Sequence, residues 1–555
     1  MRTAGGTARL DGFTPWPREL AERYRHAGCW RGETLADVID AAAQTRPDSV
    51  AIVDGSRRVT YRELVRRSRG VAAGLGALGI RRDDRVIVQM PSTLEFLDLT
   101  LALFRIGALP VMALPAHREH ELAHLAAHAE AVAYAAPAQH RGFDHLAMGR
   151  ALRDGSTTLR HLLVTEGEAS PDAVALASLS EHVPLEDGDT GPGPEPGDVA
   201  LFLLSGGTTG LPKLIPRTHD DYAYNARASA ELCGLGPHTV YMVALPIGHN
   251  FPLACPGVLG TLMAGGRVVL STDPGPEAAF PLIAAERVTA TAVVPALAIR
   301  WLESPLRREA DLSSLELLQV GGARLAPEVA RRVRPELGCA LQQVFGMAEG
   351  LLNFTRPDDP EEVVVDTQGR PLSPEDEIRI VDPLDEPVPP GQLGELQVRG
   401  PYTLRGYYRA EEHNARSFTP DGLYRSGDLV RLHPSGNLVV EGRVKDLINR
   451  GGEKISAEEI ENLMLAHPGV LTCAAVAMPD PELGERTCAY AVPRGGAPLT
   501  LEALTTFLVE RRIARYKLPE RLEVVDELPL TKVGKVDKAA LREDIVRKLE
   551  AEAAA

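Results

Sequence analysis

The sequence predicts an α/β fold in three parts: a large N-terminal region of layered α/β subdomains, a small β-rich subdomain and a small α+β C-terminal domain. Three observations support this prediction. The 555 residues exceed the roughly 250–300 that one hydrophobic core can organise. Amphipathic helical segments alternate with short apolar runs up to about Asn353. Beyond this point short strands are divided by Gly, Pro and Asp, which is typical of a β-rich unit.

The N-terminal region shows the α/β alternation from about residue 33. Residues 61–79 have the spacing of an amphipathic helix, and the β-rich run RVIVQM follows at 85–90. The turn-rich segment 186–198 leads into VALFLLS at 199–205, an apolar run short enough for a buried strand. Further strands are predicted from TVYMVAL, GRVVLS, ATAVVP and LELLQVGG, with helices between them. A mainly parallel sheet is therefore expected.

The rest of the chain predicts two smaller units. The β-rich part covers about residues 354–442 and includes DEIRIVD, GQLGELQVRGPYTLRGYY and GNLVVEGR. The α+β elements that follow are helices at 456–468 and 501–512 and strands at 474–480 and 521–529. We place the domain boundary near 442–446, which divides the chain into residues 1–442 and 443–555.

Composition and charge restrict the class of function. The chain is 44% hydrophobic and 25% charged, as in ordinary globular proteins, and its net charge of −16 argues against nucleic-acid binding, which needs a basic surface. We find neither a signal peptide nor an apolar run of about 20 residues, so we expect a cytoplasmic protein without a membrane partner. The six cysteines lack metal-binding spacing, which indicates reduced thiols and no zinc site.

A glycine- and hydroxyl-rich segment, SGGTTGLPK at 205–213, follows a predicted strand. Glycines allow backbone N–H groups to approach a phosphate, and hydroxyls and a lysine add donors and charge. The segment is not a Walker motif, because its lysine follows Gly-Leu-Pro, and a flexible surface loop is the alternative interpretation. The residues expected to contact phosphates are Ser205, Gly206, Gly207, Thr208, Thr209, Gly210 and Lys213.

This segment and four later motifs, in the same order, resemble the adenylate-forming superfamily of acyl-CoA synthetases, nonribosomal peptide synthetase adenylation domains and luciferases. The later motifs are VFGMAEG at 344–350, YRSGDL at 424–429, EGRVKDLINRGGEKI at 441–455 and PLTKVGK at 529–535. FTPWP at 13–17 resembles the stand-alone aryl-acid–AMP ligases that make dihydroxybenzoyl- or salicyl-adenylate. The resemblance covers essentially the whole chain and implies ATP and Mg²⁺ as cofactors.

The resemblance implies a role for several residues at the nucleotide. Glu349 is the expected Mg²⁺ ligand, Asp428 is expected to bind the ribose hydroxyls, and Arg443 is expected near the ribose or phosphates. Without the motifs, a solvated acid, a turn-stabilising Asp and a surface ion pair are the plainer interpretations. The other residues expected beside the nucleotide are Gly321, Gly322, Ala323, Gln343, Val344, Phe345, Gly346 and Met347.

Two lysines near the C-terminus receive roles from the resemblance. Lys535 is the expected catalytic residue, whose ammonium would contact both the carboxylate and the α-phosphate, although a lysine in this position is usually only solvated. Lys445 resembles the hinge about which the mobile C-terminal domain rotates between half-reactions. That rotation would bring the GGEK loop, residues 451–454, to the active site.

The stretch GHNFPLACPG, residues 248–257, is expected to recognise the acid. By resemblance His249 lies beside the reacting carboxylate, as a further catalytic residue, although a satisfied core histidine is the plainer interpretation. Asn250 matches the Asn that binds a ring hydroxyl ortho to the carboxylate, and an apolar acyl chain would leave its amide unpaired. Further ring contacts are expected from Phe251, Gly322 and Val344. The alternative is core packing for Phe251 and Val344 and a strand-to-helix turn for Gly322.

Cys255 is expected to separate two related acids. In the family, dihydroxybenzoate ligases tend to carry Ser at this position and salicylate ligases Cys. A thiol is a weak donor, so a 3-hydroxyl facing it would be poorly satisfied, at a cost of about 1–3 kcal/mol. A nucleophilic role is disfavoured because the neighbours Pro252, Leu253, Ala254 and Pro256 are apolar. The sequence therefore favours salicylate.

The predicted reaction is ATP-dependent activation of salicylate to salicyl-AMP, with release of pyrophosphate. The acyl group would then pass to the phosphopantetheine thiol of an aryl carrier protein, in trans, for siderophore-type nonribosomal peptide synthesis. An aryl-CoA ligase and a 2,3-dihydroxybenzoate–AMP ligase stay open as alternatives. A non-catalytic sensor of nucleotide and aryl acid is disfavoured, because Lys535, Glu349 and Asp428 are all present.

Overall fold

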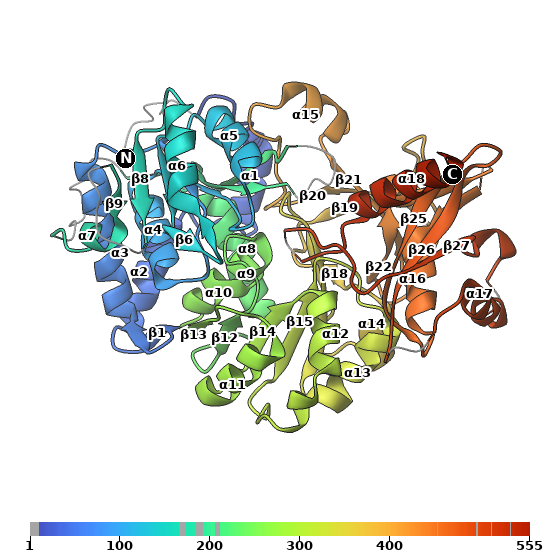
Figure 1. Ribbon diagram of the computed structural model, residues 1–555. Coiled ribbons are helices and arrows are strands. Elements are labelled where there is room, and N and C mark those ends of the chain that lie inside the picture. The colour runs from blue at the N-terminus through green and yellow to red at the C-terminus, as the bar shows by residue number, and fades with distance from the viewer. Residues whose placement is uncertain are drawn as a thin grey trace.

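The computed structural model describes residues 10–165, 172–183, 193–205, 211–451, 453–495, 498–511, 513–532 and 534–554. Figure 1 shows two large sheets with their helices, a smaller sheet beside them, and a C-terminal unit at the other side of the molecule from the N-terminus. None of the helices in these ranges has the length and apolar character that crossing a membrane requires.

One of the two large sheets has seven strands in the described residues, in the order β11-β10-β4-β3-β5-β8-β9. The strands are β3 (Arg85–Val88), β4 (Leu109–Met112), β5 (Ala133–Ala136), β8 (His161–Val164), β9 (Val174–Ala175), β10 (Val199–Leu204) and β11 (Leu214–Thr218). The helices near it in sequence are α3 (Tyr61–Ala77), α4 (Leu94–Ile106), α5 (Glu119–His128), α6 (His145–Asp154), α7 (Leu176–Leu179) and α8 (His219–Leu232). The strands are parallel except at the hairpin β10–β11.

The larger sheet has nine strands in the described residues, in the order β18-β17-β16-β15-β14-β12-β13-β1-β2. These are β1 (Val50–Asp54), β2 (Arg57–Thr60), β12 (Val240–Val243), β13 (Arg267–Leu270), β14 (Ala290–Val293), β15 (Leu317–Gly321), β16 (Ala340–Gly346), β17 (Leu352–Phe354) and β18 (Arg370–Pro371). Antiparallel pairing occurs only at its two edges among these strands, so the predicted parallel sheet is confirmed for its centre. Strands buried on both faces are near-continuously apolar, which explains why these runs were predictable.

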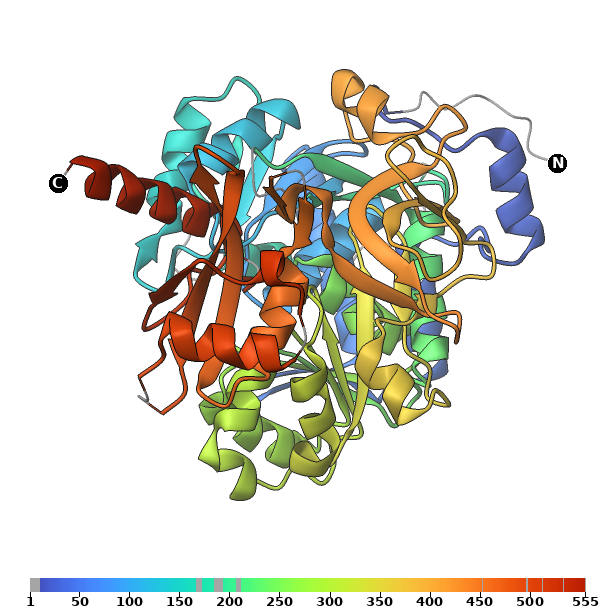
Figure 2. The ribbon, with the colours of Figure 1, turned by 90° about the vertical axis from the view of Figure 1, so that its right-hand side faces the viewer.

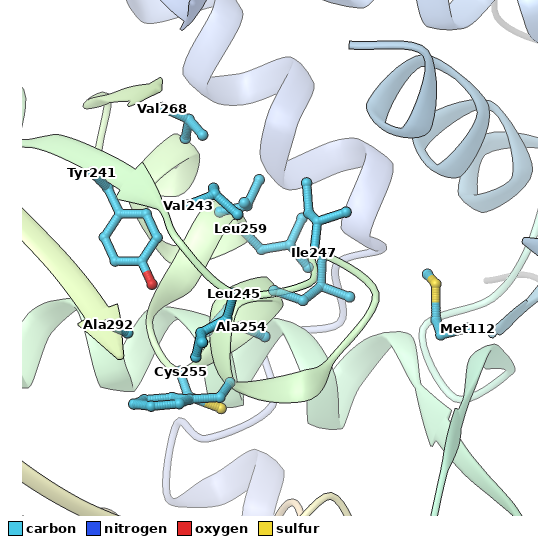
Figure 3. Packing of buried hydrophobic residues seen from close by; sticks show 14 of the residues in the cluster. Met112, Tyr241, Val243, Leu245, Ile247, Ala254, Cys255, Leu259, Val268 and Ala292 are labelled. Carbon is cyan, nitrogen blue, oxygen red and sulfur yellow. The ribbon is translucent and has the colours of Figure 1, made fainter. Parts of the chain in front are cut away.

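Further helices precede the β-rich part of the chain. They are α1 (Arg18–His26), α2 (Leu35–Thr45), α9 (Asn250–Ala254), α10 (Gly257–Met263), α11 (Pro276–Glu286), α12 (Pro295–Glu303), α13 (Pro327–Leu337) and α14 (Glu361–Asp366), with a short 3₁₀ turn η1 (Pro305–Arg308). Two-residue strands β6 (Gln139–His140) and β7 (Phe143–Asp144) form a separate hairpin. Figure 3 shows the apolar packing between β12 and the helices that follow it, with Tyr241, Leu259 and Cys255 in one cluster.

The β-rich part forms an antiparallel sheet in the order β19-β20-β21-β22. Its elements are β19 (Glu377–Val381), β20 (Gly394–Arg399), β21 (Tyr424–Leu432), β22 (Leu438–Arg443) and the helix α15 (Glu411–Ser417). The preceding strands β17 and β18 pair with the nine-stranded sheet instead. This smaller sheet therefore begins about twenty residues later than the predicted β-rich segment, at Glu377.

The C-terminal unit begins where the chain leaves β22, passes through the 3₁₀ turn η2 (Val444–Asp446), and enters a new sheet. Its elements are β23 (Leu447–Arg450), β24 (Glu453–Ser456), α16 (Ala457–Leu465), β25 (Val470–Asp480), β26 (Gly484–Pro493), α17 (Leu501–Glu510), η3 (Arg515–Lys517), β27 (Arg521–Val524) and α18 (Lys538–Ala554). Figure 2 shows this unit facing the viewer, in front of the N-terminal sheets.

The C-terminal sheet has apolar cores of its own on its two faces. Along β25, Cys473 and Ala475 belong to one buried cluster, which also contains residues of α16 and α17. The alternating residues Ala474 and Val476 belong to a second cluster, which contains Ile545 of α18. This alternation follows from the two-residue period of a strand. Apolar clusters of its own are typical of a separate structural domain.

Candidate active site

The candidate site is a cavity of about 630 Å³ between the N-terminal sheets and the C-terminal unit. His249 and Asn250 follow β12, Gly322 follows β15, and Val344 lies in β16; these residues line it together with Lys535. The three strands are parallel: β15 and β16 are neighbours in the nine-stranded sheet, and only β14 lies between β12 and β15. Ligands of open parallel sheets bind at the carboxyl ends of the strands, and the cavity has this location.

Lys535 reaches the cavity from the C-terminal unit and contacts Gly322. A Cβ added to Gly322 would lie 3.2 Å from Lys535 Cε and 3.9 Å from Nζ, and the backbone φ of +87° also favours glycine there. Burial lowers the pKa of Lys535 to about 8, and the positive charge of Arg443 contributes to the same shift. The lysine chain is thus held in a crowded, partly desolvated position.

Ion pairs connect the same two parts of the molecule. Lys532, three residues before Lys535, pairs with Glu121 of α5. Arg494, after β26, pairs with Glu303 of α12. Both pairs are partly exposed, so each contributes little stability by itself. Both pairs are formed in the domain arrangement that brings Lys535 into the cavity.

His249 is the residue before α9 and accepts a hydrogen bond at Nδ1 from the backbone N–H of Phe251, 3.3 Å away. Burial, followed by the charge of Lys535, lowers the pKa of His249 to about 4. The imidazole is therefore neutral near pH 7, and because Nδ1 accepts, its proton resides on Nε2. His249 can donate one hydrogen bond to an anionic ligand and does not act as a strong base.

Asn250 lines the cavity and is only 5% exposed. Its Oδ1 accepts a hydrogen bond from the Tyr222 hydroxyl at 2.9 Å. Within the described residues, its Nδ2 has no hydrogen-bond partner. The amide can therefore offer an N–H donor to a ligand.

Asp428 and Arg443 face each other across the β21–β22 pair. Arg443 Nε donates to Asp428 Oδ1 at 2.8 Å, and the carboxylate raises the pKa of Arg443. Asp428 Oδ2 is buried and has no partner in the described residues. A buried acceptor without a partner is uncommon, and sugar hydroxyls could satisfy this one. These residues fit the nucleotide that the motif implies.

Glu349 lies beside a pair of tyrosines. Its Oε1 accepts from the Tyr407 hydroxyl at 2.9 Å, and the Tyr407 and Tyr424 hydroxyls are 2.9 Å apart. Burial raises the pKa of Glu349. Its Oε2 has no hydrogen bond in the described residues, where we also find no cluster of three or more metal-binding side chains. A single carboxylate suits Mg²⁺, which is commonly held mainly by phosphates and water.

The phosphate loop is described only at its two ends. Ser205 lines the cavity, and its Oγ accepts from the backbone N–H of Lys213 at 3.0 Å. Lys213 Nζ lies 5.7 Å from the centre of the Tyr407 ring, the same tyrosine that binds Glu349. The predicted phosphate contacts Gly206, Gly207, Thr208, Thr209 and Gly210 lie outside the described residues, as does Gly452 of the GGEK loop.

Other predicted nucleotide contacts divide into two groups. Ala323, Phe345 and Gly346 line the cavity, as does the expected hinge residue Lys445. Gln343 does not: its Nε2 donates to the carbonyls of Val364 and Val365 at 2.6 and 2.9 Å, which fixes α14 to β16. Gly321 and Met347 are likewise not among the lining residues.

Two predicted substrate contacts, Phe251 and Cys255, lie behind the cavity surface. The Phe251 ring packs against Gly321, where an added Cβ would lie 3.0 Å from the ring. The Cys255 thiol donates to the Asn250 carbonyl at 3.4 Å, and the residue is 1% exposed. Burial raises the pKa of Cys255 to about 12, so it is a poor nucleophile. Figure 3 shows Cys255 among apolar neighbours.

Several residues at the site were not predicted from the sequence. Tyr222 of α8 contacts Asn250, and Tyr407 contacts Glu349. Lys532 lies inside the PLTKVGK motif, so its motif position could have indicated it. Tyr222 carried no such signal, since it lies in a helix well before the acid-binding stretch.

Comparisons with known proteins agree with the architecture. Residues 39–408 match the family of AMP-binding enzymes, and residues 459–535 match the AMP-binding enzyme C-terminal domain. A Streptomyces protein named salicylyl-CoA synthase / salicylate adenylyltransferase is 60% identical over 97% of this chain and 98% of its own length. A Bacillus subtilis 2,3-dihydroxybenzoate-AMP ligase is 54% identical over 97% and 99% of the two chains.

A third relative is the Mycobacterium tuberculosis salicyl-AMP ligase / salicyl-S-ArCP synthetase, 51% identical over 96% of this chain and 94% of its own. All three relatives align along nearly their whole length, through both matched domains. The chain therefore belongs to the AMP-binding, adenylate-forming enzymes, and within them it is an aryl-acid–AMP ligase.

Proposed function

We propose that this enzyme activates salicylate with ATP to form salicyl-AMP and pyrophosphate. It then transfers the salicyl group to the phosphopantetheine thiol of an aryl carrier protein in trans. The observation that carries the proposal is the convergence of an amide donor, a neutral imidazole and an ammonium on one cavity, at Asn250, His249 and Lys535. These groups suit an aromatic carboxylate with a polar ortho substituent.

In the first half-reaction a carboxylate oxygen attacks the α-phosphorus, and the bond to the oxygen that bridges to the β-phosphorus breaks. The carboxylate is already ionised, so no general base is needed. The Lys535 ammonium brings the two anions together and offsets the charge that develops on the phosphoryl oxygens. The neutral His249 donates its Nε2 proton in a hydrogen bond to the carboxylate, which orients it without removing its charge.

ATP would be held by Asp428, Arg443 and a Mg²⁺ ion bound to Glu349. Asp428 Oδ2 is the buried acceptor available for ribose hydroxyls, and Arg443 adds a cation beside it. Glu349 would hold Mg²⁺, which when bound neutralises phosphate charge. The Tyr407 hydroxyl occupies Glu349 Oε1 and leaves Oε2 for the metal.

The choice of salicylate is supported by Asn250 and by two of the relatives. The Nδ2 donor suits a hydroxyl ortho to the carboxylate, a group that salicylate and 2,3-dihydroxybenzoate share. Salicylate appears in the names of the Streptomyces and Mycobacterium tuberculosis proteins, whereas the Bacillus subtilis protein is named for the dihydroxy acid. 2,3-Dihydroxybenzoate is therefore the second candidate acid.

The thiol acceptor has two candidates. The name of the Mycobacterium tuberculosis relative includes salicyl-S-ArCP synthetase, which supports a carrier protein. The Streptomyces relative is also named salicylyl-CoA synthase, which supports coenzyme A. We place the carrier protein first, for siderophore-type nonribosomal peptide synthesis.

The second half-reaction requires the C-terminal unit to move. We infer that residues 443–555 form this domain and residues 1–442 the core, because the chain changes sheets between Arg443 and Leu447 and each unit has its own apolar core. Lys445 lies in the connecting 3₁₀ turn, where a change of backbone angles would rotate the domain. Withdrawal of Lys535 from Gly322 would accompany that rotation.

Exchange of pyrophosphate into ATP tests the first half-reaction. We expect salicylate-dependent exchange, weaker exchange with 2,3-dihydroxybenzoate, and none with a fatty acid. Lys535→Ala should abolish most exchange yet retain transfer of the acyl group from supplied salicyl-AMP to a carrier protein. Absence of exchange with every aryl acid would refute the function, and equal loss of both half-reactions in Lys535→Ala would refute the role of the lysine. Parallel assays with carrier protein and coenzyme A identify the acceptor.

A further inference from the structure

We infer that Tyr222 is a specificity-determining positioning residue: it fixes the orientation of the Asn250 amide and so makes the enzyme select ortho-hydroxy over ortho-amino aromatic acids. Tyr222 belongs to α8, and its hydroxyl donates to Asn250 Oδ1 at 2.9 Å. The inference rests on the proposed function, because it requires the ortho substituent of the acid to face Asn250.

Tyr222 is held rigidly by a buried polar frame. Its side chain is completely buried, and the guanidinium carbon of Arg217 lies 4.8 Å from the centre of its ring. Arg217 Nε in turn donates to Asp221 Oδ1 at 2.7 Å, in an ion pair that is also fully buried. Asp221 Oδ2 accepts from the backbone N–H and the hydroxyl of Thr218 at 2.6 and 2.9 Å, which anchors the frame to the start of α8. A phenol in such surroundings has little freedom to follow a ligand.

The hydroxyl of Tyr222 decides which end of the Asn250 amide faces the ligand. Asn250 Oδ1 is its hydrogen-bond partner within the described residues. If the amide were rotated by half a turn, Nδ2 would face the phenol oxygen, and the buried hydroxyl proton would have no acceptor. The orientation with Oδ1 toward Tyr222 avoids that loss. Nδ2 is consequently the end that the cavity presents, as a donor.

A donor at this point distinguishes two acids of nearly equal size. In salicylate the ortho hydroxyl gives its proton to its own carboxylate, and its oxygen retains lone pairs that accept from Nδ2. In anthranilate the ortho amino group gives one proton to the carboxylate, and the second N–H points outward, against the Nδ2 donor. Its lone pair is delocalised into the ring and accepts poorly. Two opposed donors leave both unsatisfied, so the hydroxy acid is preferred.

Tyr222→Phe removes the constraint while retaining the ring. The Asn250 amide can then rotate and offer Oδ1 to an amino group. The test measures kcat/KM for pyrophosphate exchange with salicylate, anthranilate and benzoate, the last of which has no ortho group. In the unmodified enzyme we expect the order salicylate, benzoate, anthranilate. In Tyr222→Phe we expect the ratio of salicylate to anthranilate to fall at least about tenfold, and anthranilate to exceed benzoate.

Tyr241→Phe is the matched control. Tyr241 of β12 is also buried, and its hydroxyl has no hydrogen-bond partner in the described residues, so its loss should leave all three ratios unchanged. Figure 3 shows its ring in the apolar cluster near Cys255. Equal KM values for ATP in both variants would show that the nucleotide site is intact.

The outcomes separate this inference from the proposed function. Exchange with salicylate in the unmodified enzyme, together with an unchanged order of the three acids in Tyr222→Phe, would overturn the inference alone. An equal fall of activity with all three acids would also overturn it, since that result indicates a purely structural role. Absence of exchange with any aryl acid in the unmodified enzyme would overturn the proposed function itself.

Discussion

Raising the pH from about 7 to about 9 should lower kcat/KM for adenylation about tenfold, because Lys535 loses its proton over this range. Burial, with a contribution from Arg443, lowers the pKa of this lysine from the ordinary 10.5 to about 8. The ammonium is the form that attracts the carboxylate and phosphates. Activity is therefore present below pH about 8 and declines above it, and roughly one molecule in ten keeps the proton at pH about 9.

The same pKa shift has the opposite effect on how readily Lys535 inserts into the cavity of the substrate-free enzyme, a step that we call docking. A pKa lowered from 10.5 to about 8 corresponds to roughly 3 kcal/mol against the docked ammonium. This cost is fully present below pH about 8 and disappears as the pH rises toward the ordinary pKa. In the absence of substrates, docking should thus improve as activity falls. Bound substrate anions offset this cost of docking. The alkaline decline, or limb, of kcat should therefore lie at a higher pH than that of kcat/KM.

The assay is pyrophosphate exchange at low salicylate concentration across about pH 6 to 10. His249 and Cys255 titrate outside this window, with pKa values of about 4 and about 12. Glu458 lines the same cavity, and burial raises its pKa to about 7, so Glu458→Gln is measured in parallel. Lys535→Arg should react more slowly but lack the alkaline limb, because a guanidinium stays protonated. A flat profile of the unmodified enzyme, or the same limb in Lys535→Arg, would refute the reasoning.

Three further substitutions test single contacts. Gly322→Ala should lower the rate of adenylation at least about tenfold and leave the rate of transfer from supplied salicyl-AMP within about threefold. The reason is that the new Cβ would lie 3.2 Å from Lys535 Cε. Similar losses in both half-reactions would contradict this. Asp428→Asn should raise KM for ATP about tenfold without changing KM for salicylate, as separate titrations of the two substrates would show. Cys255→Ser should retain exchange with salicylate within about threefold, because the buried thiol is a poor nucleophile and does not line the cavity, whereas a folded but inactive protein would support a nucleophilic role.

The larger sheets were predictable because their strands are short apolar runs bounded by turns. VALFLLS, for example, contains β10 (Val199–Leu204), and LELLQVGG contains β15 (Leu317–Gly321). The long strand β26 (Gly484–Pro493) was missed, since its first residues, Gly-Glu-Arg-Thr, are polar and signal a loop. Pairing with β25 on one side and β27 on the other makes this segment a central strand. Tertiary context, more than local preference, decides such cases.

The candidate site was predicted to the extent that its chemistry lies in motifs. Lys535 and His249 are far apart in the sequence, yet both line one cavity. Gln343 was expected beside the nucleotide, but its amide is used to fix α14. A motif states that a residue is near the ligand, and it does not state which side of the strand the side chain occupies. A shift of one residue along a strand places a side chain on the opposite face of the sheet.

Cys255 and Tyr222 show the same limit more sharply. The sequence places Cys255 five residues after Asn250, and we expected it to face a 3-hydroxyl of the acid. In the structure its thiol donates to the Asn250 carbonyl, and Cys255 is not among the lining residues. Tyr222, with no motif of its own, contacts the amide that faces the ligand. Recognition of an ortho substituent depends on whether that amide presents a donor or an acceptor. Because α8 supplies the hydroxyl that decides this, the specificity of the site is fixed by a contact between distant segments, which residue types within GHNFPLACPG alone do not determine.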